Sequence, residues 1–173
     1  MDKRKNIEIN PTKYETTVER KSERELVVIR TFNGPAHVVF KAWTKPELLK
    51  QWWTPKSSGV SFLSCEADVR TGGTYRFVFS HACSEQPIAF FGRYVEVTPD
   101  SRLVWTNDEG EEGAVTTVTF EERDGETLVA MHDLYPSKKA LDDAIASEST
   151  SGCPEQFEQL DQLLVDLETS VRR

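Results

Sequence analysis

Residues 60–135 constrain the fold most, because this long middle stretch of the chain has no helical periodicity. It consists of short segments rich in β-branched and aromatic residues, which are typical of strands. Glycine and aspartate turn signals separate the segments at about the spacing of an antiparallel meander. We expect strands over Phe62 to Arg70, Thr74 to Ser80, Ile88 to Val97, Arg102 to Thr106, Ala114 to Glu121, and Glu126 to Leu134.

Other segments on both sides complete the expected fold. The run 26–32 reads as a further strand, which gives seven strands in total. Apolar residues at helical spacing predict two short helices over about 35–43 and 46–53. A weaker helical segment follows at 138–145, and a long amphipathic helix begins at Pro154.

This order predicts an α+β fold with one antiparallel sheet and helices gathered on one face. A twisted seven-stranded sheet must curl, and if it curls around the last helix, the two short helices close only part of the open side. A ligand-sized cavity would then remain between the sheet and the long helix. Solid packing of the same side chains is the alternative interpretation.

Alternate residues of each strand form the expected inward face. The four inward sets are Tyr75, Phe77 and Phe79; Phe91, Arg93, Val95 and Val97; Leu103 and Trp105; and Val118 and Phe120. Arg93 is the informative member, because a buried guanidinium needs an anion, a carbonyl or a carboxylate as its partner. If Arg93 lies near the rim of the sheet instead, it can reach water or pair with an acid.

Composition excludes several classes of protein. The chain has 173 residues with 21 basic and 29 acidic side chains, so its net charge of −8 argues against nucleic acid as a partner. No apolar run is long enough to span a membrane and no signal segment is evident, so we expect no stable membrane insertion and a cytoplasmic location. Residues 1–22 read as a polar arm and 23–173 as a single domain.

The cysteine and histidine pattern indicates neither disulfides nor a metal site. The chain has three cysteines, Cys65, Cys83 and Cys153, and no C-x-x-C pair. We therefore expect no disulfide framework. The nearest approach to metal-ligand spacing is His81-x-Cys83, and the other histidines lie in unrelated segments. The chain carries no nucleotide-binding or zinc-protease motif, so we expect no metal and no cofactor.

Several motifs together resemble a known family. Arg30-Thr31-Phe32-Asn33-Gly34-Pro35, the stretch 39–48 and Trp52-Trp53-Thr54-Pro55 resemble the opening of the proteins similar to the C-terminal domain of the activator of Hsp90 ATPase (AHSA1-like proteins). That family belongs to the START-like, Bet v 1-like SRPBCC superfamily. Residues 68–76 and 92–106 are similar to its next two hairpins, and the resemblance covers about residues 25–168.

The resemblance implies a helix-grip fold, in which a curved seven-stranded sheet grips a long C-terminal helix around a hydrophobic cavity. Members usually carry a Gly-Trp pair before the final helix, whereas this chain has Gly152-Cys153-Pro154. We interpret Cys153 as a small packed residue rather than a nucleophile. The expected cavity lining is Trp53, Tyr75, Phe77, Phe79, Phe91, Arg93, Trp105, Cys153, Phe157, Leu160 and Leu164.

Three functions are compatible with these features. The first is binding of a small hydrophobic or amphipathic ligand, either a lipid or an aromatic metabolite, in the cavity. The second is an enzyme of the cyclase, dehydratase or hydrolase type with candidates His81, His132, Tyr75 and Arg93, although no catalytic motif supports it. The third is an interaction module for an Hsp90-type chaperone, with Trp52-Trp53 as a docking patch. A monomer and a homodimer both fit the sequence.

Overall fold

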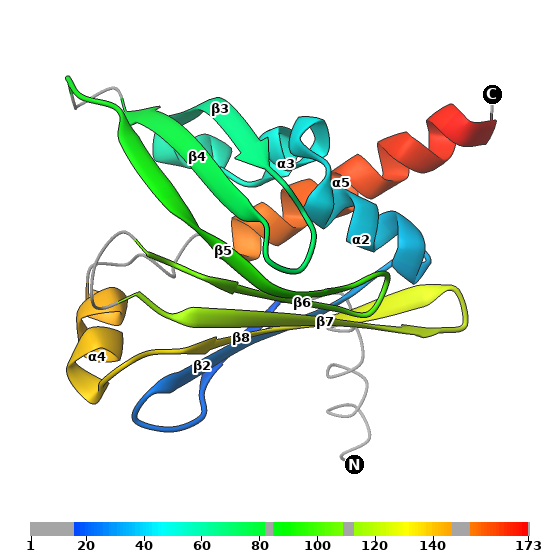
Figure 1. Cartoon of the computed structure of the whole chain (residues 1–173). Coiled ribbons are helices and arrows are strands. Elements are labelled where there is room, and N and C mark those ends of the chain that lie inside the picture. Colours follow the sequence, from blue (N-terminus) through cyan, green and yellow to red (C-terminus); the bar gives the residue numbers. More distant parts are fainter. Residues whose placement is uncertain (1–15, 82–84, 109–112, 147–152, 173) are drawn as a thin grey trace, which may run out of the picture.

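The computed structural model describes residues 16–81, 85–108, 113–146 and 153–172. It has a helix-grip α+β fold with one eight-stranded antiparallel sheet, in the order β1-β2-β8-β7-β6-β5-β4-β3 (Figure 1). The elements are β1 (Thr17–Arg20), β2 (Glu25–Phe32), α2 (Ala36–Thr44), α3 (Pro46–Trp52), η2 (Lys56–Ser58), β3 (Val60–Ala67), β4 (Thr74–His81), β5 (Ile88–Thr98), β6 (Arg102–Thr106), β7 (Val115–Arg123), β8 (Glu126–Leu134), α4 (Lys138–Ala146) and α5 (Cys153–Arg172).

The sheet bends so that one face becomes concave. Strands β3, β4 and β5 turn away from the plane of β6, β7, β8 and β2, and α2, α3 and α5 lie on the side toward which they turn (Figure 1). Helix α5 contacts α3, α2 and β2. Within the described part of the chain, no helix is both long and apolar enough to cross a membrane.

The apolar stripe of α5 explains its position. Phe157, Leu160 and Leu164 follow one another at three- and four-residue steps and are at most 3% exposed. Phe157 packs edge-on against Phe32 of β2, with ring centroids 5.4 Å apart. The three α5 residues expected from the sequence therefore lie against the interior of the fold. Cys153 begins α5, but its side chain lies outside the described residues.

The expected count of seven strands is wrong, because the structure has an additional edge strand. Strand β1 pairs with β2 in the register from Thr17 opposite Ile29 to Arg20 opposite Leu26. All four β1 side chains are exposed. Because β1 is held by backbone hydrogen bonds and not by an apolar face, its sequence lacks the alternation that predicts a strand.

The predicted inward face is wrong in the first half of β5. Phe90 lies opposite Phe77, so the even-numbered residues face inward and Phe91, Arg93 and Val95 face outward. The register shifts between Tyr94 and Glu96, at a β-bulge. Beyond the bulge, the phase changes and Val97 packs against the core. The inward positions expected on the neighbouring strands are confirmed: Tyr75, Phe77, Phe79, Leu103, Trp105, Val118 and Phe120.

The indole ring of Trp43 occupies the centre of the core. It contacts five aromatic rings, with centroid distances between 4.8 and 6.2 Å: Trp52, Trp53, Trp105, Phe120 and Phe157. These rings come from α2, α3, the sheet and α5, so one cluster joins both layers of the fold. The centre of the interior is therefore filled by side chains.

Strands β5 and β6 approach each other closely at one glycine of β5. A Cβ atom at Gly92 would overlap the carbonyl oxygen of Thr106. We expect Gly92→Ala to lower the free energy of unfolding by about 1–3 kcal/mol, because a backbone atom has to move. The matched control is Gly34→Ala, whose Cβ meets no atom within 4 Å and which should change stability by less than about 0.5 kcal/mol. Urea unfolding compares the two variants, and equal stabilities would contradict this account of the strand contact.

Candidate functional site

Aromatic side chains continue from the core to the open end of the concave face. The members of this aromatic surface come from β3, β4, β5 and the end of α3: Trp53, Phe62, Phe77, Phe79, Ile88 and Phe90. Phe77 and Phe79 are each 6% exposed, whereas Phe90 is 43% and Ile88 is 48% exposed. The aromatic surface thus runs from the buried interior out to solvent.

Strand pairing places these rings on one face. Phe62 is opposite Phe79, and Phe77 is opposite Phe90. Directly opposite residues of antiparallel strands project on the same side, so all four rings share the concave face. The Phe62 ring lies 4.5 Å from Phe79, and the Phe90 ring lies 5.4 Å from Phe79. The half-buried Trp53 closes over Phe77 at 5.7 Å.

The first turns of α5 hold the segment that carries Trp53. The Gln156 side chain donates a hydrogen bond to the Trp53 carbonyl oxygen. Gln159 donates to the carbonyl oxygens of Trp52, at 3.1 Å, and Thr54, at 2.9 Å. Two hydrogen bonds from Ser57 hold the pKa of the Glu155 carboxyl below its usual value. These polar side chains of α5 therefore fix one wall of the aromatic surface.

A row of directly opposite residues crosses the concave face next to this surface. In strand order from β2 to β5, the row is Leu26, Asp133, Thr116, Trp105 and Tyr94. Trp105 belongs to the Trp43 cluster, whereas Thr116 and Asp133 are polar. The concave face thus changes from aromatic to polar between adjacent strands.

A chain of hydrogen bonds, which we call the polar network, ends on Asp133. The Tyr75 hydroxyl lies 2.7 Å from Thr106 O and 3.2 Å from Asn107 Oδ1, and its single proton is shared between these two acceptors. Asn107 Nδ2 donates to Ala114 O at 2.6 Å and reaches Thr116 Oγ1 at 3.5 Å. Thr116 Oγ1 then donates to Asp133 Oδ1 at 2.6 Å. Asn107 donates toward Thr116 and Thr116 donates to Asp133, so the Asp133 carboxyl is the final acceptor.

Burial changes the acidity of three groups near the concave face. Desolvation raises the pKa of Asp133, although the Thr116 hydrogen bond and nearby His132 oppose this shift. Burial likewise raises the pKa of the Tyr94 hydroxyl and raises the pKa of the Cys65 thiol to about 11. The Cys65 thiol is therefore protonated at neutral pH and is a poor nucleophile.

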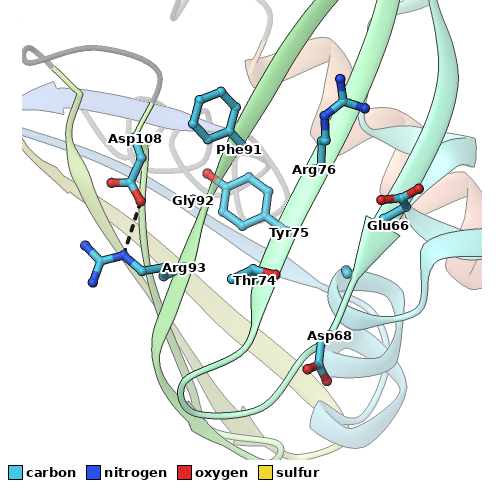
Figure 2. Close-up of a pocket in the computed structure, with 10 residues that line it drawn as sticks. Glu66, Asp68, Thr74, Tyr75, Arg76, Phe91, Gly92, Arg93 and Asp108 are labelled. Carbon is cyan, nitrogen blue, oxygen red and sulfur yellow. Dashed lines mark hydrogen bonds and ion pairs between the residues drawn. The ribbon is translucent and has the colours of Figure 1, made fainter.

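The outer face of β3, β4 and β5 carries a separate open hollow of about 660 Å³ (Figure 2). Its lining is mixed in charge and includes Glu66, Asp68, Arg76, Phe91, Arg93 and Asp108. The expectation that Phe91 and Arg93 line an interior cavity is wrong, because both project into this hollow. The Arg93 side chain is 64% exposed and pairs with Asp108 at 3.2 Å.

The arginine that does face inward is Arg30. It is 7% exposed, lies over the Phe32 ring and pairs with Asp161 of α5 at 3.2 Å. Arg30 was not predicted from the sequence, although a basic residue in phase with the buried Leu26, Val28 and Phe32 is a signal for it.

The enzyme candidates named from the sequence do not meet at one point. His132 projects from the outer face of β8 and pairs with Glu25 at 2.9 Å. His81 ends β4, and Arg93 lies in the outer hollow, so only Tyr75 belongs to the polar network. Among the described residues, no group of three histidine, cysteine or acidic side chains could hold a metal ion. Cys83 lies outside the described residues.

The polar members of the site were missed by the sequence analysis. On β8 the inward positions are Thr127, Val129, Met131 and Asp133. An acidic residue in phase with three core positions is the signal that could have identified Asp133. No comparable signal exists for Asn107, because its side chain joins the network from an irregular segment after β6.

Comparison with known families agrees with this architecture. The model of the family described as Activator of Hsp90 ATPase homolog 1-like protein matches residues 33–165. The chain belongs to this AHSA1-like family. No curated protein matches the chain.

Solved structures show the same fold as this AHSA1-like chain. A protein from Rhodobacter sphaeroides has a TM-score of 0.80 at 24% identity, over 88% of this chain and 99% of its own. A protein from Nitrosomonas europaea has a TM-score of 0.78 at 22% identity, over 87% and 99%. An AHSA1-like protein from Aeromonas hydrophila has a TM-score of 0.66 at 17% identity, over 80% and 92%. At these identities the likeness concerns the fold.

The buried Asp133 gives a prediction for stability against pH. Because folding raises its pKa, the folded state binds more protons than the unfolded state between the ordinary and the raised values. The Asp133 contribution to stability is therefore present at low pH and is lost as the pH rises through the folded pKa. We expect Asp133→Asn to be more stable than the wild type at neutral pH, and this advantage should shrink toward pH 3. Urea unfolding across this range measures the difference, and a difference that is independent of pH would contradict the raised pKa.

Proposed function

We propose that this AHSA1-like protein binds a small hydrophobic or amphipathic ligand, such as a lipid or an aromatic metabolite, on the aromatic surface. One observation carries the proposal: Phe90 faces the concave side and is continuous with buried rings, yet it is 43% exposed. A core-facing phenylalanine that stays in water is a favourable contact for an apolar ligand.

The free energy expected from burying an apolar ligand supports binding. Removing about 300 Å² of apolar ligand surface from water contributes about 7 kcal/mol before the costs of association. Each well-placed aromatic contact adds about 0.5–1.5 kcal/mol. Because the Trp43 cluster fills the centre of the fold, the proposed ligand lies at the open end of the concave face and not in an enclosed central cavity.

Two adjacent phenylalanines of β5 provide a matched test. Phe90 and Phe91 are 43% and 41% exposed, but they project from opposite faces of the sheet. We expect Phe90→Ser to weaken binding of the apolar dye Nile red about tenfold, because the dye loses an aromatic contact. Phe91→Ser should leave the affinity within about twofold of the wild type. Dye fluorescence titration measures both variants.

Three results of this titration would count against the proposed site. Absence of saturable dye binding to the wild type would remove the proposal. Equal losses in the two variants would show that the dye does not distinguish the faces. A loss confined to Phe91→Ser would move the binding site to the outer hollow.

The family description supplies a second candidate, a contact with an Hsp90-type chaperone. Trp52 is 1% exposed, so it does not contribute to the docking patch that the sequence allowed at Trp52-Trp53. If the chain acts on such a chaperone, adding it to a purified Hsp90 should increase the rate of ATP hydrolysis. An unchanged rate would remove this candidate.

A further inference from the structure

We propose that the bound ligand carries a hydrogen-bond donor, a hydroxyl or an amine, and that Asp133 accepts this hydrogen bond at the polar end of the site. This inference rests on the proposed function, because it assigns the orientation of an apolar ligand on the same concave face. The ligand class is then an apolar body with a terminal alcohol or amine.

The cross-strand row places Asp133 within reach of such a ligand. Asp133, Thr116 and Trp105 occupy the same face on three consecutive strands, and the Trp105 ring lies 6.4 Å from Trp53 of the aromatic surface. Neighbouring strands are about 4.8 Å apart, so about 10 Å separates Trp105 from Asp133. Trp105 and Thr116 are only 9% and 4% exposed, so the ligand has to pass beside them, and an alkyl chain of medium length is long enough for this span.

The hydrogen bonds around Asp133 leave one side of its carboxyl group unused. Thr116 donates to Oδ1. Among the described residues, the Thr116 bond is the one side-chain hydrogen bond found for Asp133, and the carboxyl group has no ion pair with a lysine or arginine. The adjacent His132 projects from the other face and pairs with Glu25.

The surroundings of Asp133 explain why a ligand donor is needed. Protein atoms desolvate the carboxyl group, although the residue as a whole keeps some exposure to solvent. A desolvated carboxylate without a cationic partner is unfavourable unless further hydrogen bonds compensate for the lost water. Since the hydrogen bonds of the polar network end on Asp133 and no further described residue donates to it, we assign the remaining compensation to the ligand.

Three dodecyl compounds separate the possible polar contacts. Dodecylammonium only donates, 1-methoxydodecane only accepts, and 1-dodecanol does both. Displacement of Nile red at pH 8 measures each affinity with the intact chain. We expect dodecylammonium and dodecanol to bind at least about tenfold more tightly than the ether, because a hydrogen bond to a charged group is stronger than a neutral one.

Asp133→Asn provides the decisive variant. Its amide oxygen can keep the Thr116 hydrogen bond, and its NH₂ group then takes the place of Oδ2. We expect dodecylammonium to lose at least about tenfold in affinity, the ether to gain, and dodecanol to change least. Asp124→Asn is the control for the loss of one negative charge. Asp124 lies at the other end of β8, in a turn with φ of 55°, a conformation that asparagine tolerates.

The outcomes distinguish this inference from the proposed function. If Nile red binds but all three dodecyl compounds displace it equally well, the donor assignment fails and the aromatic site stands. If the affinity for dodecylammonium falls equally in Asp124→Asn and Asp133→Asn, the binding of this compound reflects net charge and the inference is wrong. If Nile red itself does not bind, the proposed function has failed first. Thermal unfolding of both variants shows that each is folded.

Discussion

The packing of rings around Trp43 is the interaction on which the rest of the structure depends. This one indole contacts aromatic side chains from α3, α5, β6 and β7. Because these contacts fill the centre, the sheet and the helices pack directly against each other there. On the concave side of β5, the exposed apolar side chains are those of Ile88 and Phe90, at the open end. The same cluster that stabilises the fold therefore determines where a ligand could bind.

The concave face combines two chemistries that lie side by side. Aromatic residues of β3, β4 and β5 form one part of this face, while Asp133 and Thr116 carry hydrogen-bonding groups on β8 and β7. In apolar pockets with a few polar groups, the apolar contacts commonly supply the affinity and the polar groups fix the orientation of the ligand. The outer hollow differs, because it is open and its lining includes charged side chains of both signs.

Much of the fold could be predicted because its signals are local. The stripe on α5 and the alternation of Tyr75, Phe77 and Phe79 follow from simple periodicity, and both are confirmed. Strand β5 could not be assigned in this way, because the bulge before Glu96 changes the phase within a single strand. Its two adjacent phenylalanines look alike in the sequence, and only pairing with β4 distinguishes their faces.

The polar part of the site was harder to predict, because it depends on contacts between distant segments. Asp133 gains its surroundings from Thr116 and, through it, from Asn107 and Tyr75, which are separated by up to 58 positions along the chain. No spacing rule connects such residues. Likewise, β1 is recognisable as a strand only through its partner β2.

Intermolecular nuclear Overhauser effects test the central claim most directly. With 1-dodecanol bound to the isotope-labelled protein, we expect contacts from the alkyl chain to the rings of Trp53 and Phe90 and to the methyl groups of Ile88. Contacts from the alkyl chain to Phe91 and Arg76 would place the ligand on the outer face instead. That result would contradict a binding site on the concave aromatic surface.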